Sequence, residues 1–470
     1  MKFTLLLAGL SLVAAAPADA DASAYSNVLS IINKHQSHHA KRDLADLAES
    51  AKERYLVFFK NGTSIQSING HIQDLDSKVS PEVGAMAGTN GFAATGSNQG
   101  IQGAFDIDAF TDGKGFTGYF GSFNTSVLDS IRSSPDVASV EKDVLISLGK
   151  HVAHPVNLTE LHKRNFESTT VAQWGLGRIS HLNNIVQGVN PEEPSTVRVS
   201  YNRESSKYDT TVYVVDTGTY VEHGDFGGRA RWGANFVQGE PMQDLNGHGT
   251  HVAGTVAGST VGVSGEKTSI VAVKVLNKKG QGYASTIIQG MNWVISDYQK
   301  AGQPRSVINF SGGGASSVGL DQVFQQAVQQ YGIPTVVAAG NDGQDACNES
   351  PARASRGVAG LITVGATDHL DHIAVEQDWS SAKGQCVEMF APGVTILSLW
   401  ITNNDAAATM GGTSMAAPHV AGAIAYFQSI ADGIVPAGVL ESWVKDASVN
   451  KVQGDLAGAG NNLLWNRASF

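Results

Sequence analysis

Beyond about residue 171, short apolar runs alternate with longer stretches that have helical spacing. The apolar runs predict strands at Thr211–Val215, Ser269–Val275, Ser306–Phe310, Thr335–Ala339 and Leu361–Val364. The longer stretches predict helices at Gly249–Ala257, Ala284–Lys300, Gly319–Tyr331 and Ser414–Ile430. This alternation is typical of an α/β fold with a parallel sheet, in which ligands bind outside the carboxyl ends of the strands.

The first third of the chain has a different pattern. The pattern predicts strands at Tyr55–Phe59, Phe116–Phe123 and Val137–Ile146. It predicts helices between them, at Thr63–Leu75 and Thr125–Ser133. A Gly/Ala-rich insert, residues 84–103, interrupts them. These elements predict a small α+β unit, an open sheet with two helices.

Polar segments divide the chain further. Residues 21–53 predict a linker, and residues 149–170 predict a second linker with the basic pair Lys163-Arg164 as a processing zone. We therefore expect two folded units, residues 54–148 and residues 171–470.

The N-terminus has the pattern of a secretory signal. Met1-Lys2 precedes the apolar run Leu5–Ala16, and small residues offer cleavage positions near 16–20. The run is too short to span a bilayer, so residues 1–20 predict a signal peptide and no membrane span is expected. The signal leaves two destinations open, secretion and a vacuole.

Composition narrows the function classes. The formal net charge of −11 argues against nucleic acid as a partner. Two cysteines are too few for a disulfide-rich scaffold or a four-cysteine zinc site.

Ser414 is the first candidate for chemistry. The glycines Gly411 and Gly412 precede it, and Pro418 is tolerated in a helix's first turn, so Ser414 is expected at a helix N-terminus. Unpaired N–H groups there stabilise negative charge that develops beside the hydroxyl. From this segment alone, an N-cap serine is the alternative, and it is the commoner use of a serine before a helix.

Three other polar residues follow strands or open helices. Asp216 ends the run Thr211–Val215, His248 opens the helix at 249–257, and Asn341 follows the strand at 335–339. Each alone has an ordinary alternative, such as a turn residue. Together they supply an acid, a base, an amide donor and a nucleophile. Ser414 would attack a carbonyl, His248 would transfer the proton, Asp216 would orient the imidazole, and Asn341 would stabilise the oxyanion.

An α/β-hydrolase site is excluded, because the acid and base precede the serine and the second glycine of its nucleophile elbow is missing.

These segments resemble the subtilisin-like serine proteases, and within them the fungal proteinase K and cerevisin group. The resemblance lies in Val215-Asp216-Thr217-Gly218, Gly247–Gly254, Ala339-Gly340-Asn341 and Gly412–His419, and Trp174–His181 is similar to the start of the mature chain in that group. It implies a three-layer, parallel-sheet catalytic domain. The segments Arg54–Lys60, Gly118–Gly121 and Ser134–Asp143 resemble the inhibitory propeptide of these proteases, a ferredoxin-like domain.

The resemblance also implies a substrate cleft in which extended peptides pair with backbone strands. Its residues are Gly280, Gln281, Gly282, Ser311, Gly312, Gly313, Gly314, Ala339 and Gly340. Gly312 stands where the family usually has leucine, which removes an apolar wall and changes the expected P1 or P4 preference. The cysteines Cys347 and Cys386 match a cysteine pair in cerevisin-like relatives, so a disulfide is expected in an oxidising compartment, with two buried thiols as the alternative.

Glu388 stands where relatives have a calcium-binding Asp. No cofactor is expected to be required for catalysis, and a structural calcium near Glu388 is left open. Asn61, Asn124, Asn157 and Asn348 open sequons for glycosylation.

The expected function is that of a serine endopeptidase made as a self-processing zymogen. We expect it to cut its own chain near residues 163–170, to have its own propeptide as an intramolecular inhibitor, to act on proteins and peptides, and to be a monomer. The alternative from another class is a catalytically silent subtilase fold that binds peptides or a partner protease.

Overall fold

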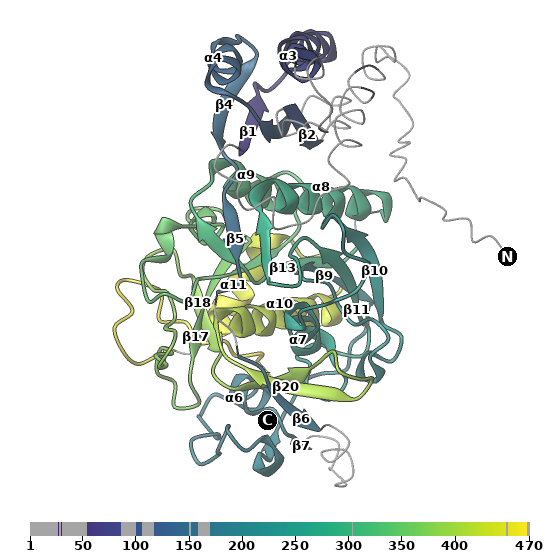
Figure 1. The fold of residues 1–470 in the computed structure, drawn as a ribbon. Helices are drawn as coiled ribbons and strands as arrows, with labels where there is room; N and C mark the ends of the chain where they lie inside the picture. The colour runs from purple at the N-terminus through teal and green to yellow at the C-terminus, as the bar shows by residue number, and fades with distance from the viewer. Residues whose placement is uncertain are drawn as a thin grey trace, which may run out of the picture. The chain divides into compact units, whose positions relative to one another are not determined.

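The computed structural model describes Asn27, Ser30 and residues 54–85, 100–105, 117–149, 152–157, 170–302, 304–447 and 450–467 (Figure 1). The chain divides into two compact units, Met1–Lys142 and Asp143–Phe470. The predicted signal peptide and the basic pair Lys163-Arg164 lie outside the described residues, as does the first linker apart from Asn27 and Ser30.

The first unit is an antiparallel sheet with two helices. The strands lie in the order β2-β3-β1-β4. Apolar side chains of the sheet and of both helices, among them Val57, Ile72 and Leu128, form one core. The elements are β1 Arg54–Phe59, α3 Ile65–Ala85, β2 Gly100–Phe105, β3 Gly118–Ser122, α4 Thr125–Ser133 and β4 Val137–Lys142. This βαββαβ order with an antiparallel sheet confirms the predicted α+β, ferredoxin-like unit.

The predicted single strand Val137–Ile146 is wrong, because the chain leaves the first sheet after Lys142. The Asp143 carboxylate accepts hydrogen bonds from Ser285 N and Ser285 Oγ, at 2.9 and 2.7 Å. The Val144 carbonyl accepts one from Ala284 N. These oxygens satisfy donors in the first turn of α8, Ala284–Lys300. The chain then forms a separate strand, β5, at Leu145–Ser147.

The second unit is built on a seven-stranded parallel sheet in the order β10-β11-β9-β13-β15-β17-β18. Its strands are β9 Thr210–Asp216, β10 Ala230–Asn235, β11 Thr268–Lys274, β13 Ser306–Phe310, β15 Thr335–Ala338, β17 Leu361–Thr367 and β18 Met389–Pro392. Five of them were predicted to within three residues, because each is a continuous apolar run. The edge strands β10 and β18 were not predicted.

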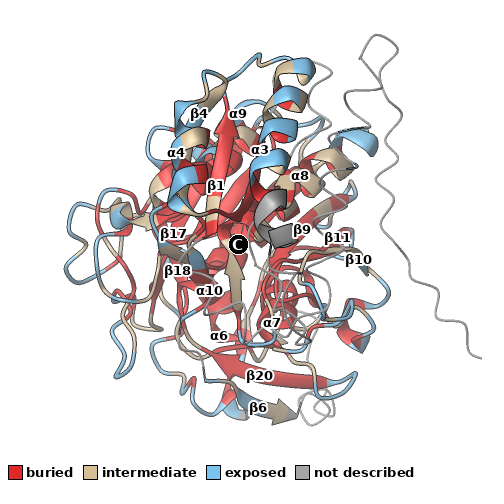
Figure 2. Ribbon diagram, turned by 45° about the horizontal axis from the view of Figure 1, so that its top comes forward, coloured by how far each residue is buried: buried red, intermediate tan, exposed pale blue. Residues whose placement is uncertain are grey.

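Helices cover both faces of this sheet. Figure 1 shows α8 and α9, Val318–Gln329, on the opposite side from α7, His248–Ala257, and α10, Thr413–Ile430. From Thr413 to Ser429 every residue of α10 is buried (Figure 2). The predicted three-layer α/β class is confirmed. A further helix, α11 Ala437–Ala447, packs against α10.

Pro418 lies deeper in α10 than predicted, since the helix begins at Thr413 and Pro418 is its sixth residue. A proline has no N–H, so the carbonyl four residues earlier, that of Ser414, loses its helical partner. The Ser311 hydroxyl donates to this carbonyl instead, at 3.0 Å. The Ser414 carbonyl therefore has a hydrogen-bond donor in spite of the proline.

Two small sheets flank the main one. The first has the order β12-β5-β14-β16, and the second has the order β19-β20-β6. Their strands are β12 Gln281–Tyr283, β14 Gly313–Ala315, β16 Glu349–Ser350, β19 Ile396–Leu399, β20 Ala406–Met410 and β6 His154–Asn157. The segments of residues 145–147 and 154–157 thus join sheets whose other strands come much later in the chain.

Candidate active site

The predicted acid and base lie in direct contact. Asp216 is the last residue of β9, and His248 is the first residue of α7. His248 Nδ1 lies 2.9 Å from Asp216 Oδ1 and 3.0 Å from Oδ2, and both side chains are buried. A ring nitrogen this close to an ionised carboxylate carries the proton and donates it, which leaves Nε2 as the basic nitrogen of the neutral ring.

The turn before His248 is held by a carboxylate that sequence reasoning missed. Asp244 is buried and accepts hydrogen bonds from Gly247 N, from Thr250 N and from the Thr217 hydroxyl. The Thr217 hydroxyl accepts in turn from Gly249 N. An Asp that closely precedes a helix start is a capping signal, so its position was a usable clue.

Gly249 is required where the two segments meet. A Cβ atom at this position would lie 2.0 Å from the Gly218 carbonyl oxygen. Only glycine lets the first turn of α7 approach the loop after β9 this closely. That approach brings the His248 ring to Asp216.

The candidate nucleophile is held by Ser311, which follows β13. Ser414 is the second residue of α10 and is buried. Its hydroxyl donates to the Ser311 carbonyl at 3.0 Å. Because a hydroxyl has one proton, transfer to His248 requires the Ser414 O–H to turn from the Ser311 carbonyl. Packing of α10 against α7 and β9 brings the elements that carry Ser414, His248 and Asp216 together.

Asn341 is oriented by the residue before Ser414. Its Oδ1 accepts from Thr413 N at 2.8 Å and from the Thr413 hydroxyl at 3.0 Å. With the oxygen engaged in this way, the Nδ2 amide is directed elsewhere as a donor. The helix start thus fixes the orientation of the amide.

The chain's own strand β5 lies between the two predicted walls of the cleft. Ser147 pairs with Gln281 on one side and with Gly313 on the other. Ile146 pairs with Gly282 and Gly314, and Leu148 N donates to the Gly280 carbonyl at 3.1 Å. All contacts are antiparallel backbone contacts, as expected for a bound extended peptide.

Beyond β5 the chain reaches Asn341. A Cβ atom on Gly149 would lie 3.9 Å from Asn341 Nδ2. Gly149 also has a positive φ of 78°. The backbone of Gly149 therefore lies beside the amide predicted to stabilise an oxyanion.

Two apolar side chains lie beside Gly312. A Cβ there would lie 3.0 Å from the ring of Phe310 and 3.6 Å from Leu148 Cδ2. The buried Phe310 ring therefore supplies an apolar surface beside this position.

Glu349, which sequence reasoning also missed, lies behind the cleft. A Cβ on Gly340 would be 2.6 Å from Glu349 Oε2, and one on Gly313 would be 3.3 Å from it. Burial, with a smaller effect of the Asp342 charge, raises the pKa of Glu349 to about 7. The side chain therefore changes charge near neutral pH beside two of the predicted cleft glycines.

The expected disulfide is present. Cys347 and Cys386 are bonded, with their Cα atoms 5.2 Å apart. Their bond links the segment after Asn341 to the loop that leads into β18.

The surroundings of Glu388, where a calcium ion was left open, do not fit a cation. The Glu388 carboxylate is paired with the Lys445 ammonium, which also contacts Glu441 at 2.5 Å. A lysine that donates to this carboxylate would repel calcium. Within the described part of the chain, no three His, Cys, Asp or Glu side chains are grouped so as to hold a metal ion.

None of the helices in the described ranges is both long and apolar enough to cross a membrane.

Comparison with known families covers both units. Residues 207–462 match the model of the subtilase family, and residues 54–148 match that of the peptidase inhibitor I9 family.

Similar proteins are named as fungal proteases. The alkaline extracellular protease of Yarrowia lipolytica is 38% identical over 95% of this chain and 91% of its own length. Cerevisin of Saccharomyces cerevisiae is 37% identical over 81% of this chain and 56% of its own. The cuticle-degrading serine protease of Arthrobotrys oligospora is 35% identical over 90% of this chain and 92% of its own length.

A solved structure agrees with them. A cold adapted subtilisin-like serine proteinase, 38% identical in sequence, covers 63% of this chain and 98% of its own, with a TM-score of 0.53. The chain therefore belongs to the subtilase family of serine proteases and carries an N-terminal I9 propeptide domain.

Proposed function

We propose that this subtilase is an endopeptidase that works through Asp216, His248 and Ser414 with Asn341 as oxyanion donor, and that it processes itself from a zymogen. The observation that carries the proposal is the strand Leu145–Ser147, which lies in the cleft as a substrate would and leads to Gly149 beside Asn341.

The chemistry follows from the site. Ser414 Oγ attacks the carbonyl carbon while His248 Nε2 takes its proton, and the Asn341 amide and Ser414 N–H stabilise the oxyanion. As the C–N bond breaks, His248 gives the proton to the leaving nitrogen. Water then attacks the acyl ester, again losing a proton to His248, which returns it to Ser414 Oγ. Asp216 keeps the proton on Nδ1 and stabilises the imidazolium.

The position of Gly149 supports a first self-cut at the bond that follows it. A second cut near residues 163–170 would then produce the mature chain, residues 171–470 forming its peptidase domain. Until released, residues 54–148 would act as the intramolecular inhibitor. The expected substrates are other proteins and peptides, the expected state is a monomer, and the N-terminal signal would direct the chain to secretion or a vacuole with glycosylation at exposed sequons.

The test compares wild type with Ser414→Ala, expressed in a host that lacks related proteases. Intact mass and N-terminal sequencing should show wild type starting near residues 165–171 and labelled at Ser414 by a fluorophosphonate. The variant should remain full length and unlabelled. Normal trimming of the variant would refute self-processing, and an unlabelled, uncut wild type would favour the silent binding fold.

A further inference from the structure

A second strand from the linker occupies another edge of the peptidase unit. β6, His154–Asn157, pairs antiparallel with β20 on the side opposite β19. β20 ends at Met410, four positions before Ser414. His154 pairs with Thr409, nearer Ser414 in the chain, and Asn157 pairs with Ala406. The linker strand therefore starts at the catalytic end of β20 and leads away from it.

The register shows which backbone groups hold β6. Trp400 N donates to the Ala406 carbonyl at 2.8 Å, so the backbone groups of Ala406 face β19. Because these groups alternate along an antiparallel strand, those of Ala407 and Thr409 face β6. Their partners are Val156 and His154.

Pro155 fits this register. It pairs with Ala408, whose backbone groups face β19, so no N–H is needed from residue 155 toward β20. The interaction with β20 thus relies on the backbone of His154 and Val156.

Side chains add little selectivity. His154 and Pro155 are exposed, while Ala153 and Val156 are half-buried and pack against the main core. Backbone pairing together with one or two small apolar contacts is a general way to bind extended polypeptide.

The position of Gly149 allows the residues of β6 to be numbered relative to the cut bond. If Gly149 provides the carbonyl that is attacked, His154 is the fifth residue after the cut bond and Asn157 is the eighth. We propose that the edge of β20 from Ala406 to Thr409 binds residues five to eight positions downstream of the cut bond in polypeptide substrates. The inference rests on the proposed function. β6 fills this edge in the precursor, and removal of the linker frees it.

The test uses mature enzyme and quenched fluorescent peptides with the sequence of residues 145–157. The unmodified long peptide ends at residue 157, and a short peptide ends at residue 153. Two further long peptides each carry a single backbone N-methyl group, one at Val156 and the other at Asn157. The Val156 methyl blocks an N–H that faces β20, whereas the Asn157 methyl blocks one that faces away.

The unmodified long peptide should have a kcat/KM at least about fivefold above that of the short one, from two added hydrogen-bonded pairs. The Val156 methyl should abolish most of this gain and the Asn157 methyl should preserve it. Equal values for short and long peptides, or equal effects of both methyl groups, would overturn the proposal. If no peptide is cut while a denatured protein is degraded, the placement of Gly149 is wrong and the proposal falls with it. If neither is cut, the proposed function fails.

Discussion

The missing N–H group of Pro418 changes the hydrogen bonds at the start of α10. The Ser414 carbonyl, which has no helical donor, accepts a hydrogen bond from the Ser311 hydroxyl. The Ser414 hydroxyl in turn donates to the Ser311 carbonyl. Ser311 therefore forms hydrogen bonds with both the backbone carbonyl and the side-chain hydroxyl of Ser414, the candidate nucleophile. Sequence placed Ser414 near a helix start, but the partner of its carbonyl depends on a strand about a hundred residues earlier, which no local pattern shows.

Ser311→Ala should reduce stability by about 1–3 kcal/mol, because a buried carbonyl loses its donor. Denaturant unfolding in a Ser414→Ala background, which avoids autolysis, measures the change. Ser306→Ala is the matched control, since the buried Ser306 hydroxyl on β13 has no hydrogen-bond partner among the residues that the structure describes. Equal losses in the two variants would contradict this role of Ser311.

Asn341→Ala should lower kcat by about a hundred- to a thousandfold with KM little changed, the range known for the corresponding amide of subtilisin. The amide would stabilise charge that exists only during the reaction. Steady-state kinetics on a peptide substrate separates the two constants. A raised KM with an unchanged kcat would show that Asn341 binds substrate rather than the oxyanion.

Element-scale prediction from the sequence succeeded where a segment's own composition decides its structure. The five buried sheet strands and α4 are continuous or periodic apolar patterns. The strands β5, β6, β19 and β20 were missed, because they are short or rich in alanine and depend on partners distant in the chain. The candidate catalytic residues could be located because each adjoins a well-predicted element. Asp244 could have been located from its place just before a helix start, whereas Glu349 lies beside cleft glycines that are distant in the chain.

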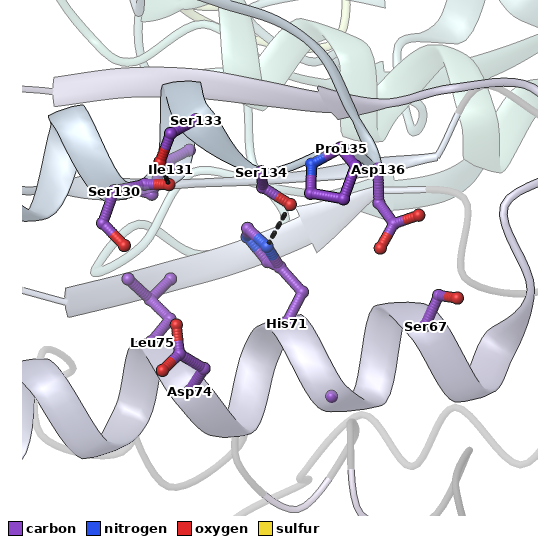
Figure 3. A pocket seen from close by; sticks show the side chains of 11 residues that line it. Ser67, His71, Asp74, Leu75, Ser130, Ile131, Ser133, Ser134, Pro135 and Asp136 are labelled. Atoms are coloured by element: carbon purple, nitrogen blue, oxygen red, sulfur yellow. Dashed lines mark hydrogen bonds between the residues drawn. The ribbon is translucent and has the colours of Figure 1, made fainter.

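The packing of α3 against β3 contains a histidine with altered titration. His71 Nε2 lies 2.8 Å from Tyr119 Oη. The Nδ1 atom of the same ring lies 3.2 Å from Ser134 Oγ (Figure 3). Burial lowers the pKa of His71, and the nearby Lys78 adds to this, while Asp136 and Asp74 oppose it. The folded unit therefore favours the neutral ring.

With a lowered pKa, the unfolded chain binds the proton more readily, so the first unit should lose stability as pH falls below about 6.5. Once exchange rates are divided by the intrinsic rate at each pH, the amides of α3 and β1 in the Ser414→Ala precursor should be less protected at pH 5 than at pH 7. His71→Gln should reduce this difference, while His372→Gln, at an exposed site in the second unit, should not. An unchanged difference in His71→Gln would assign the acid sensitivity to other groups.

At the scale of the whole molecule, one covalent link joins the segment after Asn341 to the loop before β18. Replacing both Cys347 and Cys386 by alanine should lower stability by about 2–4 kcal/mol, since a loop with a sequence separation of 39 residues is no longer closed. Unfolding in the Ser414→Ala background, with and without reductant, measures this. Reductant should lower the stability of the parent by a similar amount and leave the double variant unchanged. A parent that reductant does not affect, or a double variant as stable as the parent, would contradict the assignment.

The strand in the cleft is part of the same chain as the residues that would cut it. Its concentration at the site is set by the connecting chain and not by the amount of protein in solution. The first cut should therefore follow first-order kinetics with a half-time that dilution does not change, and added peptide substrates should compete poorly with it. Timing of activation would then be a property of each molecule, so a cell could make the precursor at any level without altering how soon it matures.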